Sequence, residues 1–197
     1  MQKNISIEIC HLKSIERVRD KIAEKVARKH IRKFFVPEEL GDTITVGDKK
    51  VMISFEVINP IEDLMSLFRE TKVKGWWENY REGLLTLFKA LSQMSVTPDL
   101  AIIAQILVWK GNLPLTEEWV CEVALVEVKR GKAGLSGYQR EDVEIAKKIG
   151  IPYYLLRVDD SDFIHGKFIL TIEPLTPQRL TLYDKFKSYV RTKPLDK

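Results

Sequence analysis

Apolar residues near the N-terminus recur at the spacing of a helix. The repeat consists of Leu12, Ile15, Val18, Ile22 and Val26. Spacings of three and four residues put these side chains on one face, which predicts an amphipathic helix over about 12–33. The outer face and flanks of this helix carry five basic residues, namely Arg17, Lys21, Lys25, Arg28 and Arg32. The helix is therefore expected to bury its apolar side and to expose a basic one.

A β-hairpin and two further helices are predicted next. Apolar and polar residues alternate over 53–57, and Gly47-Asp48 supplies a turn, so 43–58 is predicted to form two paired strands. A short helix is predicted over 60–71, because its first residue is a proline, which fits the first turn of a helix. A longer helix is predicted over about 76–94, and we interpret its apolar face as core rather than as a platform for stacking bases. That face consists of Trp77, Tyr80, Leu84, Leu87, Phe88 and Leu91.

The second half of the chain alternates between apolar runs and helical patterns. The predicted elements are strands at about 99–109 and 118–129 joined by a turn at 111–114, a glycine-rich loop at 130–137, a helix at 137–149, strands at 153–158 and 167–173, and a basic helix at 177–191. Ser136 and Gln139 have the spacing of a capping box at the start of the first of these helices. Gly150 is predicted to cap its C-terminus, and Pro152 prevents its continuation.

These elements indicate an α/β fold with a central mixed sheet flanked by helices. A length of 197 residues, of which 45% are hydrophobic, suits one compact domain with a substantial core. We divide the chain into an N-terminal helix and β-hairpin extension at 1–74, a core at 75–175 and a basic C-terminal helix at 176–197. The extension is expected to serve dimerisation or substrate binding.

Charge is distributed unevenly along the chain. Residues 1–35 hold ten Lys or Arg against four Asp or Glu, a net charge of +6, and residues 176–197 hold six against two, a net charge of +4. Because the whole chain has 32 basic and 28 acidic residues, the middle, 36–175, has a net charge of −6. An acidic centre between basic ends fits a metal site flanked by phosphate-binding arms. It fits equally well a protein whose terminal helices are merely solvated.

The sequence contains no sign of membrane insertion or export. No apolar run approaches the roughly 20 residues that cross a bilayer, and residues 1–10 lack the apolar core of a signal peptide. The two cysteines, Cys10 and Cys121, are too few for a disulfide framework or a zinc site. We therefore expect a cytoplasmic, intracellular protein with reduced cysteines and no membrane partner.

Two acidic residues are predicted to face each other at the open end of the long hairpin. Asp99 begins the first strand, Glu127 lies near the end of the second, and the midpoint between them is Leu113, within the turn. A symmetric antiparallel register would set the two carboxylates opposite each other, with Cβ atoms roughly 4.5–5.5 Å apart. Such crowding is unfavourable unless a cation lies between them, and Mg²⁺ prefers carboxylate oxygens. The backbone carbonyl of Val128 is a candidate third ligand.

Lys129 completes this pattern. Alternate residues of a strand share a face, so Lys129 is expected to point the same way as Glu127. There its ammonium group would stabilise negative charge on a metal-bound phosphate or position the attacking water. Taken separately, Pro98-Asp99 and Glu127-Val128-Lys129 are also typical of solvated strand edges. Their joint position at the ends of two apolar strands favours a functional site.

The same residues resemble a known family. Pro98-Asp99 followed by Glu127-Val128-Lys129 resembles the PD-(D/E)XK motif of the restriction-endonuclease-like nuclease superfamily. The stretch from Leu135 to Val158, with Ser136 and then Gln139-Arg140 on its helix, is similar to the VRR-type branch of that superfamily. The resemblance covers about 76–158. It implies a restriction-endonuclease-like fold and a Mg²⁺- or Mn²⁺-dependent endonuclease that cuts DNA, and a homodimer is expected because cutting a duplex needs two active sites or one acting twice.

The resemblance also suggests supporting residues. It makes Gln139 a polar residue of the site, although capping with Ser136 explains this glutamine without any function. It suggests a further metal-binding glutamate from the preceding helix, for which Glu78 is preferred over Glu82, although either side chain is also typical of a solvated helix surface. The expected DNA contacts are Arg17, Lys21, Lys25, Arg28, Lys132 and Arg140.

Other functions have weaker support in the sequence. His11, His30 and His165 are too widely spaced for a ligand pattern, and Cys10 beside His11 lacks the context of a nucleophile. The acidic run 159–162 is interpreted as a loop, with a second metal as the alternative. The rival functions are a non-catalytic nucleic-acid-binding or assembly module that retains the fold, and a metal-dependent hydrolase of small phosphate compounds.

Overall fold

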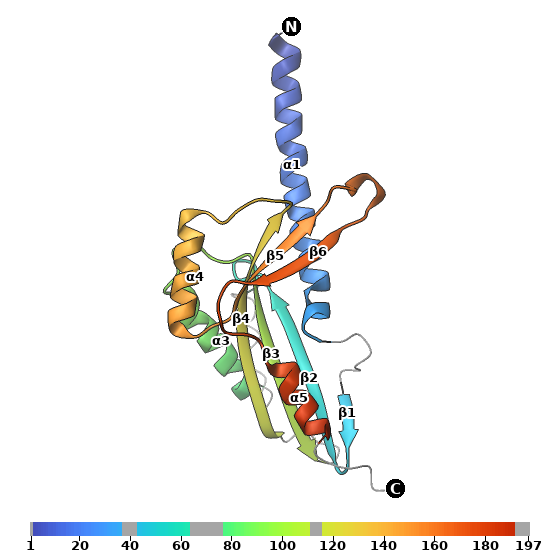
Figure 1. Cartoon of the computed structure of the whole chain (residues 1–197), viewed down its shortest axis with the longest axis vertical. Coiled ribbons are helices and arrows are strands. Elements are labelled where there is room, and N and C mark those ends of the chain that lie inside the picture. The colour runs from blue at the N-terminus through green and yellow to red at the C-terminus, as the bar shows by residue number, and fades with distance from the viewer. Residues whose placement is uncertain (1, 37–42, 64–76, 111–115, 192–197) are drawn as a thin grey trace.

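A computed structural model of the chain describes residues 2–36, 43–63, 77–110 and 116–191. Its centre is a six-stranded mixed sheet in which the strands follow one another in sequence order (Figure 1). The strands are β1 (Thr43–Val46), β2 (Lys49–Ile58), β3 (Leu100–Lys110), β4 (Thr116–Arg130), β5 (Tyr153–Asp159) and β6 (Ile169–Pro174). All neighbours are antiparallel except β4 and β5, which are parallel and connected by a helix.

Helices cover both faces of the sheet, so the predicted α/β architecture is confirmed. The described α-helices are α1 (Gln2–His30), α3 (Trp77–Leu91), α4 (Gly137–Ile149) and α5 (Leu182–Arg191). Buried residues of α1 and α5 pack on one face, and those of α3 and α4 pack on the other. Among the described residues, no helix is long and apolar enough to cross a membrane. The predicted helix at 60–71 falls largely outside the described residues, as does the turn at 111–114.

The N-terminal hairpin is continuous with the sheet. Gly47 adopts a left-handed conformation, φ 64°, at the predicted turn between β1 and β2. Strand β2 then pairs with β3 along its whole length, from Lys49 opposite Lys110 to Ile58 opposite Ala101. The hairpin that the sequence placed in an extension therefore supplies two of the six strands.

Helix α1 buries a different stripe from the one predicted. Ala23 is 2% exposed and Ala27 is 0% exposed, whereas Val18, on the expected apolar face, is 54% exposed. The small side chains of the two alanines allow the helix to approach the sheet closely, and Ile31 continues the buried stripe just beyond the helix. The N-terminal half of α1 extends beyond the sheet (Figure 1).

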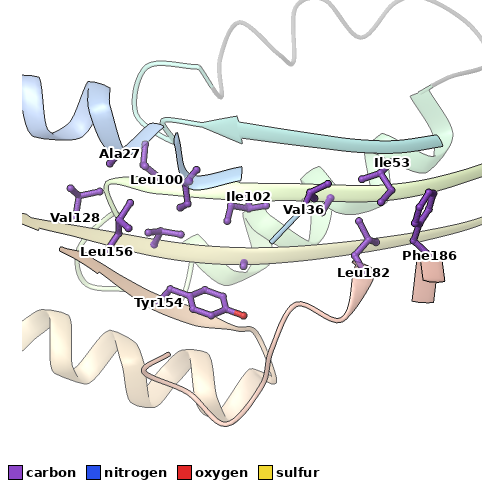
Figure 2. Packing of buried hydrophobic residues seen from close by; sticks show 14 of the residues in the cluster. Ala27, Val36, Ile53, Leu100, Ile102, Val128, Tyr154, Leu156, Leu182 and Phe186 are labelled. Carbon is purple, nitrogen blue, oxygen red and sulfur yellow. The ribbon is translucent and has the colours of Figure 1, made fainter. Parts of the chain in front are cut away.

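The core on the face of α1 and α5 is formed by alternate residues of the strands. Figure 2 shows Leu100 and Ile102 of β3 between Ala27 of α1 and Leu182 and Phe186 of α5. The intervening residues of β3 point to α3 and α4 on the opposite face, as the alternation of a strand requires. Burial on both faces explains why the predicted strands are almost continuously apolar.

Helix α4 begins and ends as predicted. The N–H of Gln139 donates to Ser136 Oγ at 3.2 Å, and the N–H of Ser136 donates to Gln139 Oε1 at 2.9 Å, which completes the capping box. Gly150, φ 78°, caps the C-terminus in the left-handed conformation. These local signals fix the position of the helix whose first turn faces the candidate site.

Helix α5 is attached to the sheet by a carboxylate of β4. Glu122 accepts hydrogen bonds from the N–H groups of Thr181, at 2.7 Å, and Leu182, at 3.0 Å. The ammonium of Lys185 lies 2.6 Å from the same carboxylate. Because this carboxylate caps the first turn, the helix begins at Leu182 rather than at the predicted residue 177.

A close contact between α3 and the sheet predicts the effect of a single methyl group. A Cβ atom added to Gly83 would lie 2.7 Å from Cys121 Sγ and 2.9 Å from Ile103 Cγ2. We expect Gly83→Ala to lower the free energy of unfolding by roughly 1–3 kcal/mol, because overpacking outweighs the helix preference of alanine. Urea unfolding would measure this. Gly134→Ala, where a Cβ meets nothing within 4 Å, should be nearly neutral, and equal stability of the two variants would contradict the close packing.

Candidate active site

The strand register brings the two predicted acidic residues together. Leu100 pairs with Val126, so Asp99, which immediately precedes β3, falls opposite Glu127, and the predicted register is confirmed. The N–H of Val128 donates to Asp99 Oδ2 at 2.8 Å and attaches the aspartate to the neighbouring strand. The two carboxylates therefore meet at one end of the β3–β4 pair.

Glu127 is buried among polar side chains. It is 2% exposed, and its Oε1 atom accepts a hydrogen bond from Lys129 Nζ at 2.7 Å and another from Gln139 Nε2. Tyr153 lies nearby: burial, followed by the charge of Glu127, raises the pKa of its phenol. Tyr153 was missed in the sequence, since only the parallel pairing of β4 with β5 brings it to this carboxylate.

The surroundings of Glu127 disfavour its ionised form in the metal-free protein. Burial, followed by the charge of Asp99, raises the pKa of Glu127 to about 7, although Lys129 opposes the shift. A divalent cation would supply the positive charge that this arrangement lacks.

A cleft of about 350 Å³ opens beside the pair, between the end of the sheet and α1. Its lining consists of Asp20, Ala23 and Glu24 from α1, Asp99, Val128, Lys129 and Arg130 from the sheet, and Ala133 from the following loop. Asp99 is half-buried and Lys129 has a side chain 18% exposed, whereas Glu127 lies almost fully buried next to them. Acidic groups thus line the cleft on both sides, and Lys129 and Arg130 line it on the side of the sheet.

Glu24 is the acidic residue that α1 contributes. Burial, followed by the charges of Asp99, Glu62 and Asp20, raises the pKa of Glu24, so its carboxyl lies near Asp99. Sequence reasoning missed it, because no spacing along the chain connects residue 24 with residue 99. A glutamate from a helix was expected here, but from a different helix.

The two glutamates that the sequence suggested for that role, Glu78 and Glu82, are not found at the site in the described residues. The side chain of Glu78 lies outside the described part of the structure. Glu82 is exposed, and burial, followed by the charge of Glu82, raises the pKa of Cys121. Cys121 is six residues before Glu127 on β4, which corresponds to roughly 20 Å along a strand. The structure therefore does not bring Glu82 to the site.

Gln139 satisfies both of its proposed roles at once. Its Oε1 atom completes the capping box with the N–H of Ser136, and its Nε2 atom donates to Glu127. The backbone N–H at the start of α4 thereby fixes the side-chain amide of Gln139, and this amide in turn fixes the carboxylate of Glu127. A buried Glu127 held from several sides cannot swing away from Asp99 without breaking these contacts.

The donor set is compatible with Mg²⁺ in part. Asp99 and Glu127 supply two carboxylates, and the Val128 carbonyl points toward the side of Asp99, since the N–H and C=O of one strand residue share a direction. Mg²⁺ is typically bound by one or two carboxylates and retains several waters. Within the described residues, no three or more His, Cys, Asp or Glu side chains form a group that could hold a metal ion. A metal here would therefore rely on the carbonyl and water for its remaining ligands.

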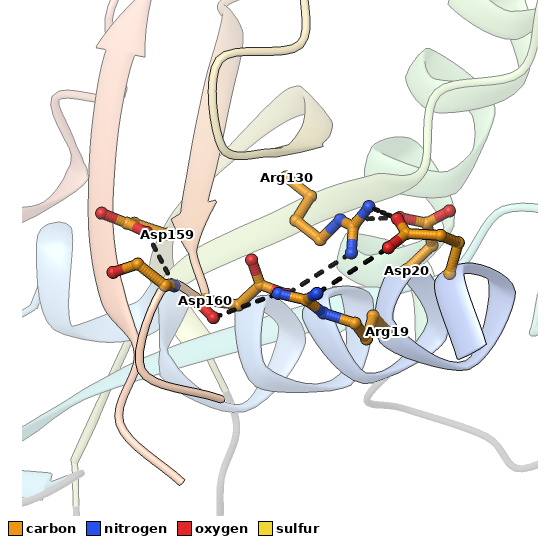
Figure 3. Close-up of polar contacts among 7 residues, drawn as sticks. Arg19, Asp20, Arg130, Asp159 and Asp160 are labelled. Carbon is orange, nitrogen blue, oxygen red and sulfur yellow. Dashed lines mark hydrogen bonds and ion pairs between the residues drawn. The ribbon is translucent and has the colours of Figure 1, made fainter. Parts of the chain in front are cut away.

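An ion-pair cluster joins α1 to the end of the sheet next to the cleft (Figure 3). Arg19 of α1 lies 2.7 Å from Asp160, and Arg130 of β4 lies 3.2 Å from Asp20 and 3.5 Å from Asp160. Arg130 also pairs with Glu16. Asp160 thus has a structural role. In the acidic run 159–162, Asp159 ends β5 and residues 160–162 form the predicted loop.

The predicted DNA-binding residues all lie on the surface. Arg17, Lys21, Lys25, Arg28, Lys132 and Arg140 are exposed. Arg28 pairs with Asp63 at 2.6 Å, and Arg140 donates to the carbonyl of Leu135 at 2.8 Å. At 3.6 residues per turn, the four basic residues of α1 fall within an arc of roughly 80°, and Glu24 lies between this arc and the buried alanines.

The raised pKa of Glu127 predicts how stability depends on pH without metal. The pKa of Glu127 rises from its usual value of 4.5 to about 7 in the folded protein. The folded protein therefore binds more protons between these pH values and becomes less stable as the pH rises through them. We expect the free energy of unfolding of Glu127→Gln to increase relative to that of the wild type as the pH is raised from about 5 to about 8. Urea unfolding in EDTA at both pH values would measure this, and a difference independent of pH would contradict it.

The chain was also compared with known proteins. No protein-family model, curated protein or solved structure matches it.

Proposed function

We propose that the chain is a Mg²⁺- or Mn²⁺-dependent endonuclease that hydrolyses phosphodiester bonds in DNA, with a restriction-endonuclease-like fold. The observation that carries this proposal is the opposition of Asp99 and Glu127 beside Lys129. Asp99 and Lys129 line the cleft, and Glu127 is buried next to them. The mixed sheet with helices on both faces is consistent with the fold that the sequence resemblance implies.

Each residue of the site has a proposed task. A divalent cation, when bound, would activate a water and stabilise charge on the phosphorus centre. Asp99, Glu127 and the Val128 carbonyl would hold it, and Glu24 also lines the cleft as a further carboxylate. Lys129 lines the cleft, where its charge would reach a bound phosphate. Gln139 and Tyr153 orient Glu127.

Two rival functions make different predictions in one assay. A module that only binds nucleic acid has no need for opposed buried carboxylates, and a hydrolase of small phosphate compounds has no need for a basic stripe on α1. Nicking of supercoiled plasmid with Mg²⁺, Mn²⁺ or EDTA, beside hydrolysis of a small phosphodiester, separates the three. Metal-dependent nicking supports the nuclease, and DNA binding without nicking supports the module.

DNA is the proposed substrate because basic residues border an acidic cleft. The exposed stripe on α1 lies next to Glu24, so a strand whose phosphates follow the stripe would pass the cleft opening. Contacts of this kind give affinity and register without reading base sequence. A homodimer is part of the proposal, since two copies would present two sites to the two strands of a duplex.

The basic stripe predicts a salt effect. Replacing Arg17, Lys21, Lys25 and Arg28 together with Gln should reduce the slope of log Kd against log salt by up to about four, since each phosphate contact contributes roughly 0.9. Fluorescence anisotropy at several salt concentrations measures it. A matched set of four exposed basic residues on α3 and α4, Arg81, Lys89, Lys147 and Lys148, serves as the control. Equal slopes for the two variants would show that the basic residues of α1 do not contact DNA.

A further inference from the structure

We propose that Asp142 on α4 is a positioning residue that fixes Asp99 for metal binding. This inference rests on the proposed function of the site. Asp142 lies in the middle of α4. Within the described residues, it forms no hydrogen bond with Asp99 or Glu127. Its influence is exerted through the backbone that leads into β3.

The contacts of Asp142 are unusual for a helix carboxylate. It is 0% exposed, its Oδ1 atom accepts from the N–H of Ser95 at 2.7 Å, and its Oδ2 atom accepts from the N–H of Val96 at 2.9 Å. No lysine or arginine of the described residues forms an ion pair with it. Burying a carboxylate is costly unless hydrogen bonds compensate it, and two charge-assisted bonds to backbone do so here. A buried carboxylate thus holds a segment that is itself exposed.

The segment that Asp142 holds ends at Asp99. Strand β3 begins at Leu100, so the strand ladder itself does not include Asp99. The aspartate is fixed on one side by the hydrogen bond between its Oδ2 atom and the N–H of Val128. On the other side, Ser95 and Val96, which lie four and three residues before Asp99, donate their N–H groups to Asp142. Without this tie, the chain between α3 and β3 could shift and carry Asp99 with it.

Helix α4 thereby sets the position of both acidic groups. Gln139 and Asp142 are three residues apart and share a face of the helix. Gln139 contacts Glu127, and Asp142 fixes the approach to Asp99. One rigid element therefore determines the separation of the two carboxylates, which is the quantity on which a shared cation depends. Residues that orient metal ligands typically alter metal affinity by about 10–100-fold when they are replaced.

The chain supplies a matched control for this role. Glu122 is also a carboxylate that accepts two backbone N–H groups from a distant segment, at Thr181 and Leu182. It holds α5, away from the cleft, and it also pairs with Lys185. Glu122→Gln therefore removes the same kind of hydrogen bond, together with an ion pair, without touching the route to Asp99. Asp142→Asn and Glu122→Gln should both lower stability, because each leaves an amide group where a carboxylate oxygen accepted a hydrogen bond.

The test is Mn²⁺ binding by the full chain, measured by electron paramagnetic resonance of free Mn²⁺ at a temperature where circular dichroism shows both variants folded. We expect Asp142→Asn to weaken Mn²⁺ binding by about tenfold or more and Glu122→Gln to change it by less than about twofold. Should Asp142→Asn fail to fold, Ser95→Pro removes the N–H partner from the other side and should weaken binding likewise.

The outcomes separate this inference from the proposed function. Wild-type Mn²⁺ affinity in a folded Asp142→Asn or Ser95→Pro chain overturns the positioning role and leaves the nuclease proposal intact. Equal weakening in Glu122→Gln also overturns it, because loss of stability alone would then explain the effect. A wild-type chain that binds no Mn²⁺ and nicks no plasmid overturns both proposals.

Discussion

Asp99→Asn and Glu127→Gln are each expected to abolish Mg²⁺-dependent cleavage of plasmid DNA while the chain remains folded. Each substitution removes one of the two carboxylates that face each other across β3 and β4, and it keeps the size of the side chain. A neutral amide is a weak ligand for a hard cation, so the site loses half of its anionic ligands. The assay is nicking of supercoiled plasmid, with folding checked by circular dichroism.

The control for this prediction is another aspartate of the same sheet. Asp159 ends β5 and accepts a hydrogen bond from the N–H of Ser161 at 2.9 Å, in the loop that follows. Asp159→Asn should therefore cleave at the wild-type rate. Undiminished wild-type activity in EDTA, or full activity of either acid-pair variant, would rule out the metal-dependent mechanism.

Lys129→Ala is expected to lower the single-turnover cleavage rate by roughly 10²-fold or more, as is typical of removing one electrostatic stabiliser. Lys129 Nζ lies 2.7 Å from Glu127 Oε1 and the side chain lines the cleft, so its charge reaches a phosphate bound there. Negative charge on the phosphate increases in the transition state, so the effect should fall on the rate more than on DNA binding. A binding titration beside the cleavage assay measures both.

The experiment on Lys129 needs a suitable pH and two comparison variants. Lys129 opposes the raised pKa of Glu127, so its loss raises that pKa further and metal binding should be compared at about pH 8 or above. Lys129→Arg should not restore the full rate, since a planar guanidinium replaces a compact charge poorly. Lys147→Ala, at an exposed position of α4, should be neutral. Wild-type cleavage by Lys129→Ala would favour the binding-module function.

Residues close together in the sequence predicted the secondary-structure elements and the acid pair of the site. The capping box at Ser136 and the left-handed Gly150 depend on residues a few positions apart, so the bounds of α4 were predicted correctly. The opposition of Asp99 and Glu127 depends on one hairpin whose turn lies midway between them, so it too followed from the sequence. In both cases the partners are connected by a single element or turn.

The residues that were missed depend on contacts between distant segments. Glu24 reaches Asp99 only because two alanines let α1 lie close to the sheet, whereas the larger apolar residues predicted a different buried stripe. Tyr153 reaches Glu127 through the parallel pairing of β4 and β5, whose register is set by a helix crossover rather than by a turn. Periodicity along one segment does not contain this information.

The attachment of α1 has a consequence for the order in which the chain folds. Arg19 and Asp160 are separated by 141 residues, and Glu16 and Arg130 by 114, whereas Asp99 and Val128 are only 29 apart. Contacts between distant residues form late, because the loop that they close loses more entropy. At roughly 5–20 residues per second, the ribosome adds the partner of Arg19 about 7–28 s after Arg19 itself. The hairpin that carries the acid pair can therefore form before Arg19 of α1 pairs with Asp160.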